Sequence, residues 1–470
     1  MDFNCLIYHC LRRLPESAKG PAFEAALLEE VAAYTEKVVA EVRPTDGVYL
    51  AVDGVVPMAK MRQQRLRRFK NAAGAAAGAW DTNAITPGTA FMEKLRLRLA
   101  ALCAGRTGWT LSAADEAGEG EHKIMAALRG KTGQHAIYGL DADLIVLSLL
   151  NAPGPTWLFR EEIEAGVIKR DDAGEECFTW FDVDLLRAHL CAGMTVGHAP
   201  YLRNYCCAMS FLGNDFLPSS LSFKMRDDGH AALIDILNKL QAANKNLVGA
   251  DGEISAAGLS ALLQCLAAEE EPRLLAFIKK KMRQAAAATG DFGLGQENWP
   301  LAERAESCLV TGFGAGMSLK ASWRDIYLRT WFGKGTVVGD LVGEYMRGVY
   351  WVWDYYRGLP VCYNWHYPWT LPPLWGWLAA NSSTTPGSAA PTVAVKATDI
   401  APAEQLALVL PLSSWQLIPV SSPCRQLPLT APWLFPKKFG YSSVGRRFFW
   451  ECEAEIPVPT IMEIKALCRG

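Results

Sequence analysis

The sequence has no CxxC pair among its 13 cysteines, which lie at irregular spacings from Cys5 to Cys468. This absence argues against a zinc ribbon or knuckle, and the odd number is typical of free thiols in a reducing compartment. No apolar run is long enough to span a bilayer, and the first residues do not form a charged-then-apolar leader. These absences predict an intracellular protein, in cytoplasm or nucleus, with no membrane partner.

A strong charge imbalance is also missing, because 47 Lys and Arg nearly balance 49 Asp and Glu. Any nucleic-acid site must therefore be a local basic patch rather than a general positive field. What is present is an ordinary globular composition, in which half of the 470 residues are hydrophobic. A chain of this length can form two or three domains with cores of their own.

Two short apolar segments, 48–53 and 135–140, predict buried strands that lead into Asp53 and Asp141. Helical patterns follow at 121–129 and 143–150. Strands that alternate with helices predict an α/β fold with a mainly parallel sheet. In such sheets functional groups gather beyond the carboxyl ends of the strands, which is where the two aspartates stand.

The rest of the chain changes in composition. Residues 224–300 predict a helical arm, and residues 301–470 predict a mixed, aromatic-rich second region. Residues 380–401 are small and polar with two prolines, which predicts a flexible loop.

Acidic side chains recur in pairs at the expected strand-to-helix turns. Glu119 and Glu121 flank a glycine in GEGEHKIM, Asp141 and Asp143 lie in GLDADLIVL, and Asp215 lies in GNDFLP. A single pair of this kind is more often a helix-start acid or a solvated turn. Several pairs after apolar strands favour a cluster that needs a cation to offset its repulsion. Such a cluster can hold Mg²⁺ ions with positions open for a substrate phosphate and water.

The segment 57–70, PMAKMRQQRLRRFK, is strongly basic. On a helix, its polar side chains on one face are Lys60, Gln64, Arg67 and Arg68. Guanidinium groups pair with phosphate oxygens through two hydrogen bonds, so this face suits a doubly charged terminal phosphate. The alternative is a solvated cationic face or one that follows a nucleic-acid backbone non-specifically. Its closeness to Asp53 favours the phosphate pocket.

Aromatic residues are dense in segment 350–375, YWVWDYYRGLPVCYNWHYPWTLPPLW. Most of these rings are expected to be core residues. One or two could be platforms on which the bases of single-stranded RNA stack.

The chain resembles the Xrn-type 5′→3′ exoribonucleases, through blocks that follow one another in order. The blocks are DFNCLIYHC (2–10), YLAVDGVVPMAKMRQQRLRRFK (49–70), ITPGTAFM (85–92), GEGEHKIM (118–125), GLDADLIVLS (139–148) and GNDFLP (213–218). Segments 351–369, 402–419 and 450–459 are similar to the second region of that family.

The resemblance implies a PIN-like nuclease domain at residues 1–223, related to flap endonucleases, and a mechanism that uses two Mg²⁺ or Mn²⁺ ions. It implies a metal site on seven acidic residues: Asp2, Asp53, Glu119, Glu121, Asp141, Asp143 and Asp215. It places the pocket for the 5′-phosphate of single-stranded RNA on Lys60, Gln64, Arg67 and Arg68. It also implies base stacking on Tyr8 and on Trp365, with Tyr363 as the alternative to Trp365. The expected activity is processive release of mononucleotides from 5′-monophosphorylated RNA.

This sequence departs from the family pattern at its start, where Asp2 has only one residue before it instead of a leading strand. A segment this short is usually frayed, so Asp2 is expected to bind its ion weakly and to require millimolar Mg²⁺. The glycine of the family block is Cys5 here. Two alternatives remain: a catalytically weakened relative that binds RNA or serves as a scaffold in a larger particle, and a DNA flap-type nuclease with the same acidic cluster.

Overall fold

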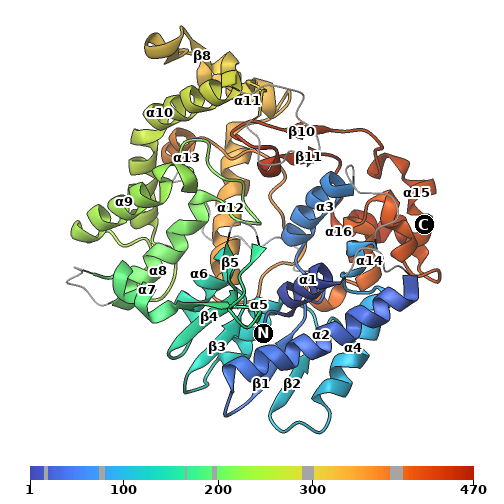
Figure 1. Cartoon of the computed structure of the whole chain (residues 1–470). Helices are drawn as coiled ribbons and strands as arrows, with labels where there is room; N and C mark the ends of the chain where they lie inside the picture. Colours follow the sequence, from blue (N-terminus) through green and yellow to red (C-terminus); the bar gives the residue numbers. More distant parts are fainter. Residues whose placement is uncertain are drawn as a thin grey trace.

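The computed structural model describes residues 1–14, 20–72, 80–164, 167–192, 198–287, 301–381 and 395–469. These residues form a mixed α/β structure in which many helices surround small sheets (Figure 1). The strands are β1 (Val48–Ala51), β2 (Trp109–Ser112), β3 (His135–Tyr138), β4 (Thr156–Glu161), β5 (Ile163–Glu164), β6 (Val167–Ile168), β7 (Phe178–Asp182), β8 (Val310–Thr311), β9 (Ser318–Leu319), β10 (Gly440–Ser442) and β11 (Glu453–Glu455).

Helices precede the first strand, and others lie between and after the strands along the chain. The helices are α1 (Phe3–Arg13), α2 (Gly20–Val42), α3 (Met58–Ala72), α4 (Ala90–Cys103), α5 (Gly120–Leu128), α6 (Ala142–Asn151), α7 (Val183–Leu190), α8 (His198–Met209), α9 (His230–Ala242), α10 (Ala256–Ala287), α11 (Trp323–Trp331), α12 (Val338–Tyr356), α13 (Trp375–Asn381), α14 (Pro402–Val409), α15 (Leu427–Thr430) and α16 (Ile461–Arg469). No helix in the described ranges is both long and apolar enough to cross a membrane.

The predicted strands at 48–53 and 135–140 are confirmed as β1 and β3, and the helices predicted after the acidic pairs are confirmed as α5 and α6. Strands β1 and β2 pair in parallel, as do β3 and β4, whereas β7 joins β4 in the antiparallel direction. These five strands therefore form a two-stranded and a three-stranded sheet rather than one uniform parallel sheet, and the other strands pair in twos.

The first two residues connect these two sheets. Asp2 pairs in parallel with Ala51 of β1, and its N–H donates to the Tyr138 carbonyl of β3 at 2.9 Å. The Met1 carbonyl accepts from the Ala51 N–H at 3.1 Å. The expectation of a frayed start is therefore wrong, because main-chain hydrogen bonds to both neighbouring strands hold Asp2 in place.

Two large apolar cores support the strands. On one side, α1, α2 and α4 pack against β1 and β3, with Phe3, Leu6 and Phe91 fully buried. On the other, α5, α6 and α8 share a core with the aromatic helix α12, which runs through the middle of the molecule (Figure 1). The dense aromatic segment is thus mainly core, as its composition predicts.

The helical character expected for residues 224–300 is seen in α9 and α10, while residues 288–300 lie outside the described part. Of the expected loop at 380–401, residues 382–394 also lie outside it. The domain boundaries at 223 and 300 stay predictions. The expectation that all cysteines are free thiols is wrong for one pair, because Cys424, in the turn before α15, and Cys468, near the end of α16, form a disulfide.

Helix α3 is anchored to the C-terminal region by Arg65, whose side chain is fully buried. Its guanidinium donates to the carbonyls of Pro457 at 2.8 Å and Leu408 at 2.6 Å, and also to that of Leu434. Burial lowers the pKa of Arg65 to about 9. Three carbonyl partners satisfy its donors, so this cation stabilises the contact between α3 and α14 through hydrogen bonds rather than through an ion pair.

Replacing Arg65 by Met should destabilise the fold by about 3–5 kcal/mol, because three buried carbonyls lose their donor together. Urea unfolding measures this change. Arg98→Met is the matched control, since Arg98 pairs with Glu29 on the surface and its loss should cost about 0–1 kcal/mol. Equal unfolding midpoints for the two variants would refute the anchoring role.

Candidate functional site

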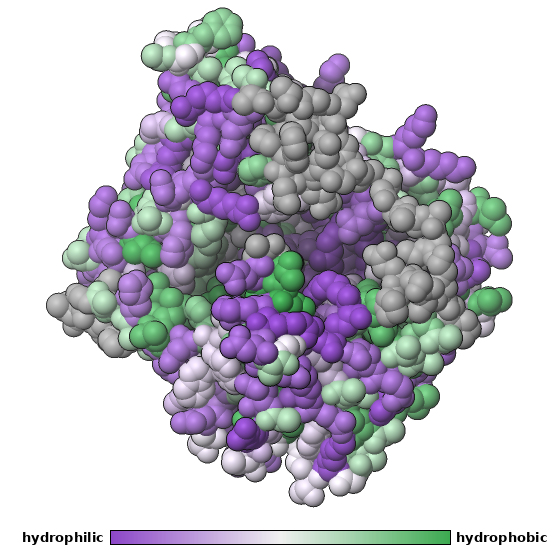
Figure 2. All heavy atoms as spheres, in the orientation of Figure 1, coloured by the Kyte–Doolittle hydropathy of each residue, from purple (hydrophilic) through white to green (hydrophobic). Residues whose placement is uncertain are grey.

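A cavity of about 700 Å³ brings the predicted acidic residues together. All seven line it: Asp2, Asp53, Glu119, Glu121, Asp141, Asp143 and Asp215. The molecule is hollowed near the centre of the face in Figure 2, and the atoms seen there are hydrophilic. The acidic cluster expected from the sequence is therefore one site in space.

Strand and helix ends explain how the site is built. Asp53 follows β1 by two residues, Glu119 is the N-cap of α5, and Asp141 is the N-cap of α6. The Asp53 carboxylate accepts from the Gly120 N–H at 2.6 Å and from the Asn4 amide at 2.7 Å. A Cβ on Gly120 would lie 2.9 Å from the Ala51 carbonyl, so only glycine lets α5 approach this closely.

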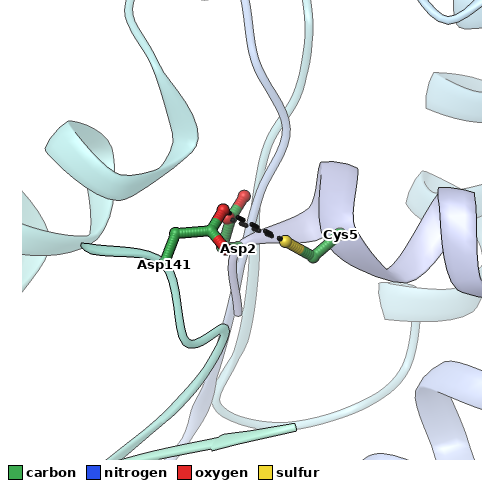
Figure 3. Close-up of side chains that lie close together, drawn as sticks. All are labelled: Asp2, Cys5 and Asp141. Atoms are coloured by element: carbon green, nitrogen blue, oxygen red, sulfur yellow. Dashed lines mark hydrogen bonds between the residues drawn. The ribbon is translucent and has the colours of Figure 1, made fainter. Parts of the chain in front are cut away.

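Asp2 and Asp141 point toward one another, with the Cys5 thiol between α1 and the pair (Figure 3). The Cys5 Sγ lies 3.5 Å from an Asp2 oxygen and 3.8 Å from an Asp141 oxygen. Burial and the neighbouring Asp53 and Asp141 raise the pKa of Asp2 to about 7. In the absence of a cation, this carboxyl is therefore partly protonated near neutral pH.

The other carboxyls show the same mutual repulsion. Burial and Asp215 raise the pKa of Asp143 to about 6. Burial and Glu119 raise the pKa of Glu121 well above its ordinary value, and the same two causes raise the pKa of Asp53. Like charges packed this closely ionise together only when a positive charge joins them.

Lys60 supplies one such charge. Its ammonium lies 2.5 Å from Glu119 and 2.7 Å from Asp215, and these two carboxylates raise its pKa well above the ordinary value against the opposing effect of burial. The sequence predicts Lys60 as part of the phosphate pocket. In the structure it lines the same cavity as that pocket but pairs with the acidic residues.

The second region of the chain reaches back into the site through α12. The Tyr355 hydroxyl donates to Glu119 at 2.8 Å, and the Tyr356 hydroxyl donates to Asp143 at 2.9 Å. Both tyrosines are buried, so these hydrogen bonds fix the direction of the two carboxylates. Residues more than 200 positions apart therefore build one site.

The remaining polar side chains of the predicted α3 face also line the cavity: Gln64, Arg67 and Arg68. Arg68 is 8% exposed, and its Nη1 has no hydrogen-bond partner among the described residues. Burial and the neighbouring Arg67 lower the pKa of Arg68 to about 10. A buried guanidinium without an acidic partner is suited to an anion.

The two predicted stacking rings have different surroundings. Tyr8 is half-buried and lines the cavity. Trp365 is 6% exposed, packs 5.1 Å from Trp351 between ring centroids, and is absent from the described lining of the cavity. The prediction that Trp365 stacks on a base is not supported, because the ring is part of the core. Tyr363 lines a different cavity, beside His122 and Tyr355.

Two groups of side chains have ligand atoms close enough to share a cation. Asp2, Cys5 and Asp141 form one, and Glu119, Glu121 and His122 form the other, each within 4.8 Å. Most of these donors are carboxylate oxygens, which fit a hard divalent cation. Burial lowers the pKa of His122 to about 4, so its imidazole is neutral at pH 7.

Sequence reasoning missed four side chains that hold the acids, Asn4, Gln63, Tyr355 and Tyr356, and also Gln405, which lines the cavity. Gln63 donates to Asp215 at 3.4 Å, and Gln405 lines the cavity while accepting from the Val56 N–H at 3.0 Å. Gln63 adjoins Gln64 of the basic face, and Asn4 is two positions after Asp2, so their places in the sequence carried a signal. The tyrosines carried none beyond their aromatic surroundings.

Comparison with known proteins agrees with this geometry. A family model described as "XRN 5'-3' exonuclease N-terminus" matches residues 1–78 and 74–162. The chain is 31% identical to 5'-3' exoribonuclease 2 of Eremothecium gossypii, over 60% of this chain and 37% of that protein. It is 30% identical to the Saccharomyces cerevisiae protein of the same name, over 57% of this chain and 34% of that one.

The match with the Schizosaccharomyces pombe protein of that name is 28%, over 58% of this chain. The aligned segments thus span little more than a third of the curated relatives. The blocks that resemble the family contain the acidic residues that follow the strands and line the cavity. Over residues 1–162, the chain is thus similar to the N-terminal region of the Xrn-type exonucleases.

Proposed function

We propose that this protein is a 5′→3′ exoribonuclease that hydrolyses 5′-monophosphorylated RNA to mononucleotides, with a PIN-like nuclease domain in its first part. The observation that carries the proposal is the shared cavity of seven carboxylates and the polar face of α3. Cleavage at a fixed distance from a terminal phosphate requires a pocket that holds this phosphate and, next to it, a cluster that binds metal ions.

The acidic cluster would hold two Mg²⁺ or Mn²⁺ ions. The oxygen donors, their raised pKa values and the two groups of close ligand atoms support this assignment. When bound, the ions supply a hydroxide nucleophile at neutral pH and stabilise the oxyanions that develop during cleavage. Tyr355 and Tyr356 hold Glu119 and Asp143 in a fixed direction, which reduces the reorganisation needed at the moment of reaction.

The polar face of α3 would bind the 5′-phosphate. Arg68 offers a buried donor that has no partner among the described residues, and Gln64, which is 8% exposed, lines the same cavity. Arg67 adds an exposed guanidinium at the mouth. A phosphate held there orients the first nucleotide so that its phosphodiester lies at the carboxylates, and Tyr8 offers a ring for its base.

Selectivity for the 5′-monophosphate follows from the same pocket. A pocket closed behind the phosphate would exclude capped and triphosphorylated ends, and an internal site has no terminal phosphate to place in it. Repeated binding of each new 5′-phosphate would make the enzyme processive.

One observation favours the weakened relative that binds RNA. The Lys60 ammonium already neutralises part of the acidic cluster. Retention of all seven acids weighs against this alternative, because a scaffold has no chemical need for repelling carboxylates. The phosphate face of α3 weighs against a DNA flap nuclease.

Asp141→Ala and Asp143→Ala should each lower Mg²⁺-dependent RNA hydrolysis about a hundredfold or more, because each removes an electrostatic element of the reaction centre. The melting temperature without metal should hold or rise, since one repelling charge is gone. Asp235→Ala, at an exposed aspartate of α9, is the control. Wild-type hydrolysis by Asp141→Ala would show that the metal assignment is wrong.

Mg²⁺ binding should release protons, because metal-free Asp2 and Asp143 have pKa values of about 7 and 6 and only their ionised forms bind the ion. Affinity should therefore increase from about pH 6 to about pH 8. Titration calorimetry in two buffers of different ionisation enthalpy counts the protons, and Asp2→Asn should release fewer. A heat that is the same in both buffers would contradict the shared-proton state.

Arg67→Ala and Arg68→Ala should slow decay of 5′-phosphorylated RNA about tenfold to a hundredfold, since a charge-assisted hydrogen bond contributes roughly 1.5–3 kcal/mol. Total RNA binding in a filter assay should fall much less. Arg96→Ala, on the surface of α4, is the control. Equal losses on 5′-hydroxyl and 5′-phosphate RNA would identify α3 as a general backbone contact.

A further inference from the structure

A second cavity, of about 460 Å³, lies beside the acidic one. The two share a wall that includes Gln63, Arg67, Asn214 and Asp215. Beyond this wall the lining comes from α3, from the segment that follows α8, and from residues 445–453, where α3 and β11 pack side by side (Figure 1). We call this space the basic chamber.

Four acidic side chains line the basic chamber. Asp215, Asp227 and Glu453 have cationic partners, whereas Glu451 accepts from the N–H groups of Arg447 and Phe448. Asp227 pairs with Lys280 and lies 3.3 Å from Arg447. Glu453 lies 3.7 Å from Arg62 and 3.9 Å from Arg446. The negative charge within the chamber is thus largely used by these pairs.

Two further cations have no such partner. Within the described residues, neither Lys224 nor Arg226 forms an ion pair with a carboxylate. Burial and the neighbouring Arg446 lower the pKa of Lys224 to about 7. A phosphate bound here would supply the missing negative charge and favour the protonated amine.

An exposed aromatic ring stands next to these cations. Trp450 is 37% exposed and lines the chamber, and the Arg226 guanidinium lies 4.6 Å from the centre of its ring. The main chain beneath it is fixed, since Lys70 donates to the carbonyls of Trp450 at 2.9 Å and Cys452 at 3.0 Å. Proteins bind single-stranded nucleic acid with cations that contact its phosphates and aromatic rings on which its bases stack, and the chamber has both.

We propose that the basic chamber binds a nucleotide downstream of the cleaved bond, with its phosphate on Lys224 and Arg226 and its base on Trp450. This inference rests on the proposed function, because it takes the acidic cavity as the place of cleavage. Asp215 lines both cavities, so an RNA strand whose phosphodiester lies at the carboxylates has only this wall to pass before it enters the chamber. This favours the downstream strand as the source of the phosphate. The released mononucleotide has the same chemistry and is the alternative source.

The test is binding of 5′-phosphorylated RNA, labelled at its 3′ end, by fluorescence anisotropy in Mg²⁺. A methylphosphonate at the first linkage prevents hydrolysis there, so binding can be measured whether or not the protein is an active nuclease. The probes are a ten-nucleotide RNA, the corresponding dinucleotide, and adenosine 5′-monophosphate measured by calorimetry. The variants are Lys224→Met with Arg226→Gln, and Trp450→Leu.

For the ten-nucleotide RNA, the double charge variant should reduce the slope of log affinity against log salt by about 0.7 for each phosphate that the chamber no longer binds. Trp450→Leu should weaken binding about 5- to 100-fold, because the base has no indole to stack on. Dinucleotide binding should change little, because its single linkage lies at the carboxylates and it has no third nucleotide whose phosphate and base could enter the chamber. Arg226→Lys should keep the wild-type salt slope, and Arg329→Gln on the surface of α11 is the control for loss of charge.

Unchanged affinity and salt slope in both the double variant and Trp450→Leu would overturn the proposal. Weakened binding confined to adenosine 5′-monophosphate would overturn the downstream strand as the source and make the chamber a product site. If the wild type cleaves no RNA while the variants still alter binding of the long RNA, the proposed function fails and the chamber stands.

Discussion

Repulsion among seven carboxylates in one cavity is the constraint on which the rest of this structure depends. Burial and mutual charge raise the pKa values of Asp2 and Asp143, so the metal-free cluster is partly protonated near neutral pH. Positive charge from Lys60 and hydrogen bonds from Asn4 and Gly120 offset the repulsion only in part. A divalent cation is the remaining way to hold all seven acids ionised.

Helix α3 connects this cluster with the rest of the chain, because one of its faces contacts the C-terminal region and another lines the acidic cavity. Arg65 on one face donates to carbonyls of the C-terminal region and fixes the helix. Gln64 and Arg68 on another face line the acidic cavity. The C-terminal region thus stabilises the helix that would bind the 5′-phosphate, while α12 holds two of the acids through tyrosines.

Local patterns in the sequence were sufficient for the strand ends and for the basic face, because hydrophobic spacing alone determines which residues follow a strand or share a helical face. Asp2 came only from the family resemblance, since no strand precedes it. The expectation that Asp2 is frayed is wrong, because Ala51 and Tyr138 hold it through main-chain contacts. These partners are distant in sequence, so local patterns could not indicate them. The burial of Trp365 was not predicted, because aromatic density does not indicate which ring remains exposed. Tyr355 and Tyr356 could not be predicted, as their role depends on where α12 packs.

We propose that one cavity binds the 5′-terminal phosphate of RNA and hydrolyses the next phosphodiester with metal ions. The most direct measurement is degradation of one labelled RNA carrying a 5′-phosphate, a 5′-triphosphate or a 5′-hydroxyl, with Mg²⁺ or with chelator. Mononucleotides should be released from the 5′-phosphate form alone, and only with Mg²⁺. Equal decay of all three forms, or decay that persists in chelator, would contradict this proposal.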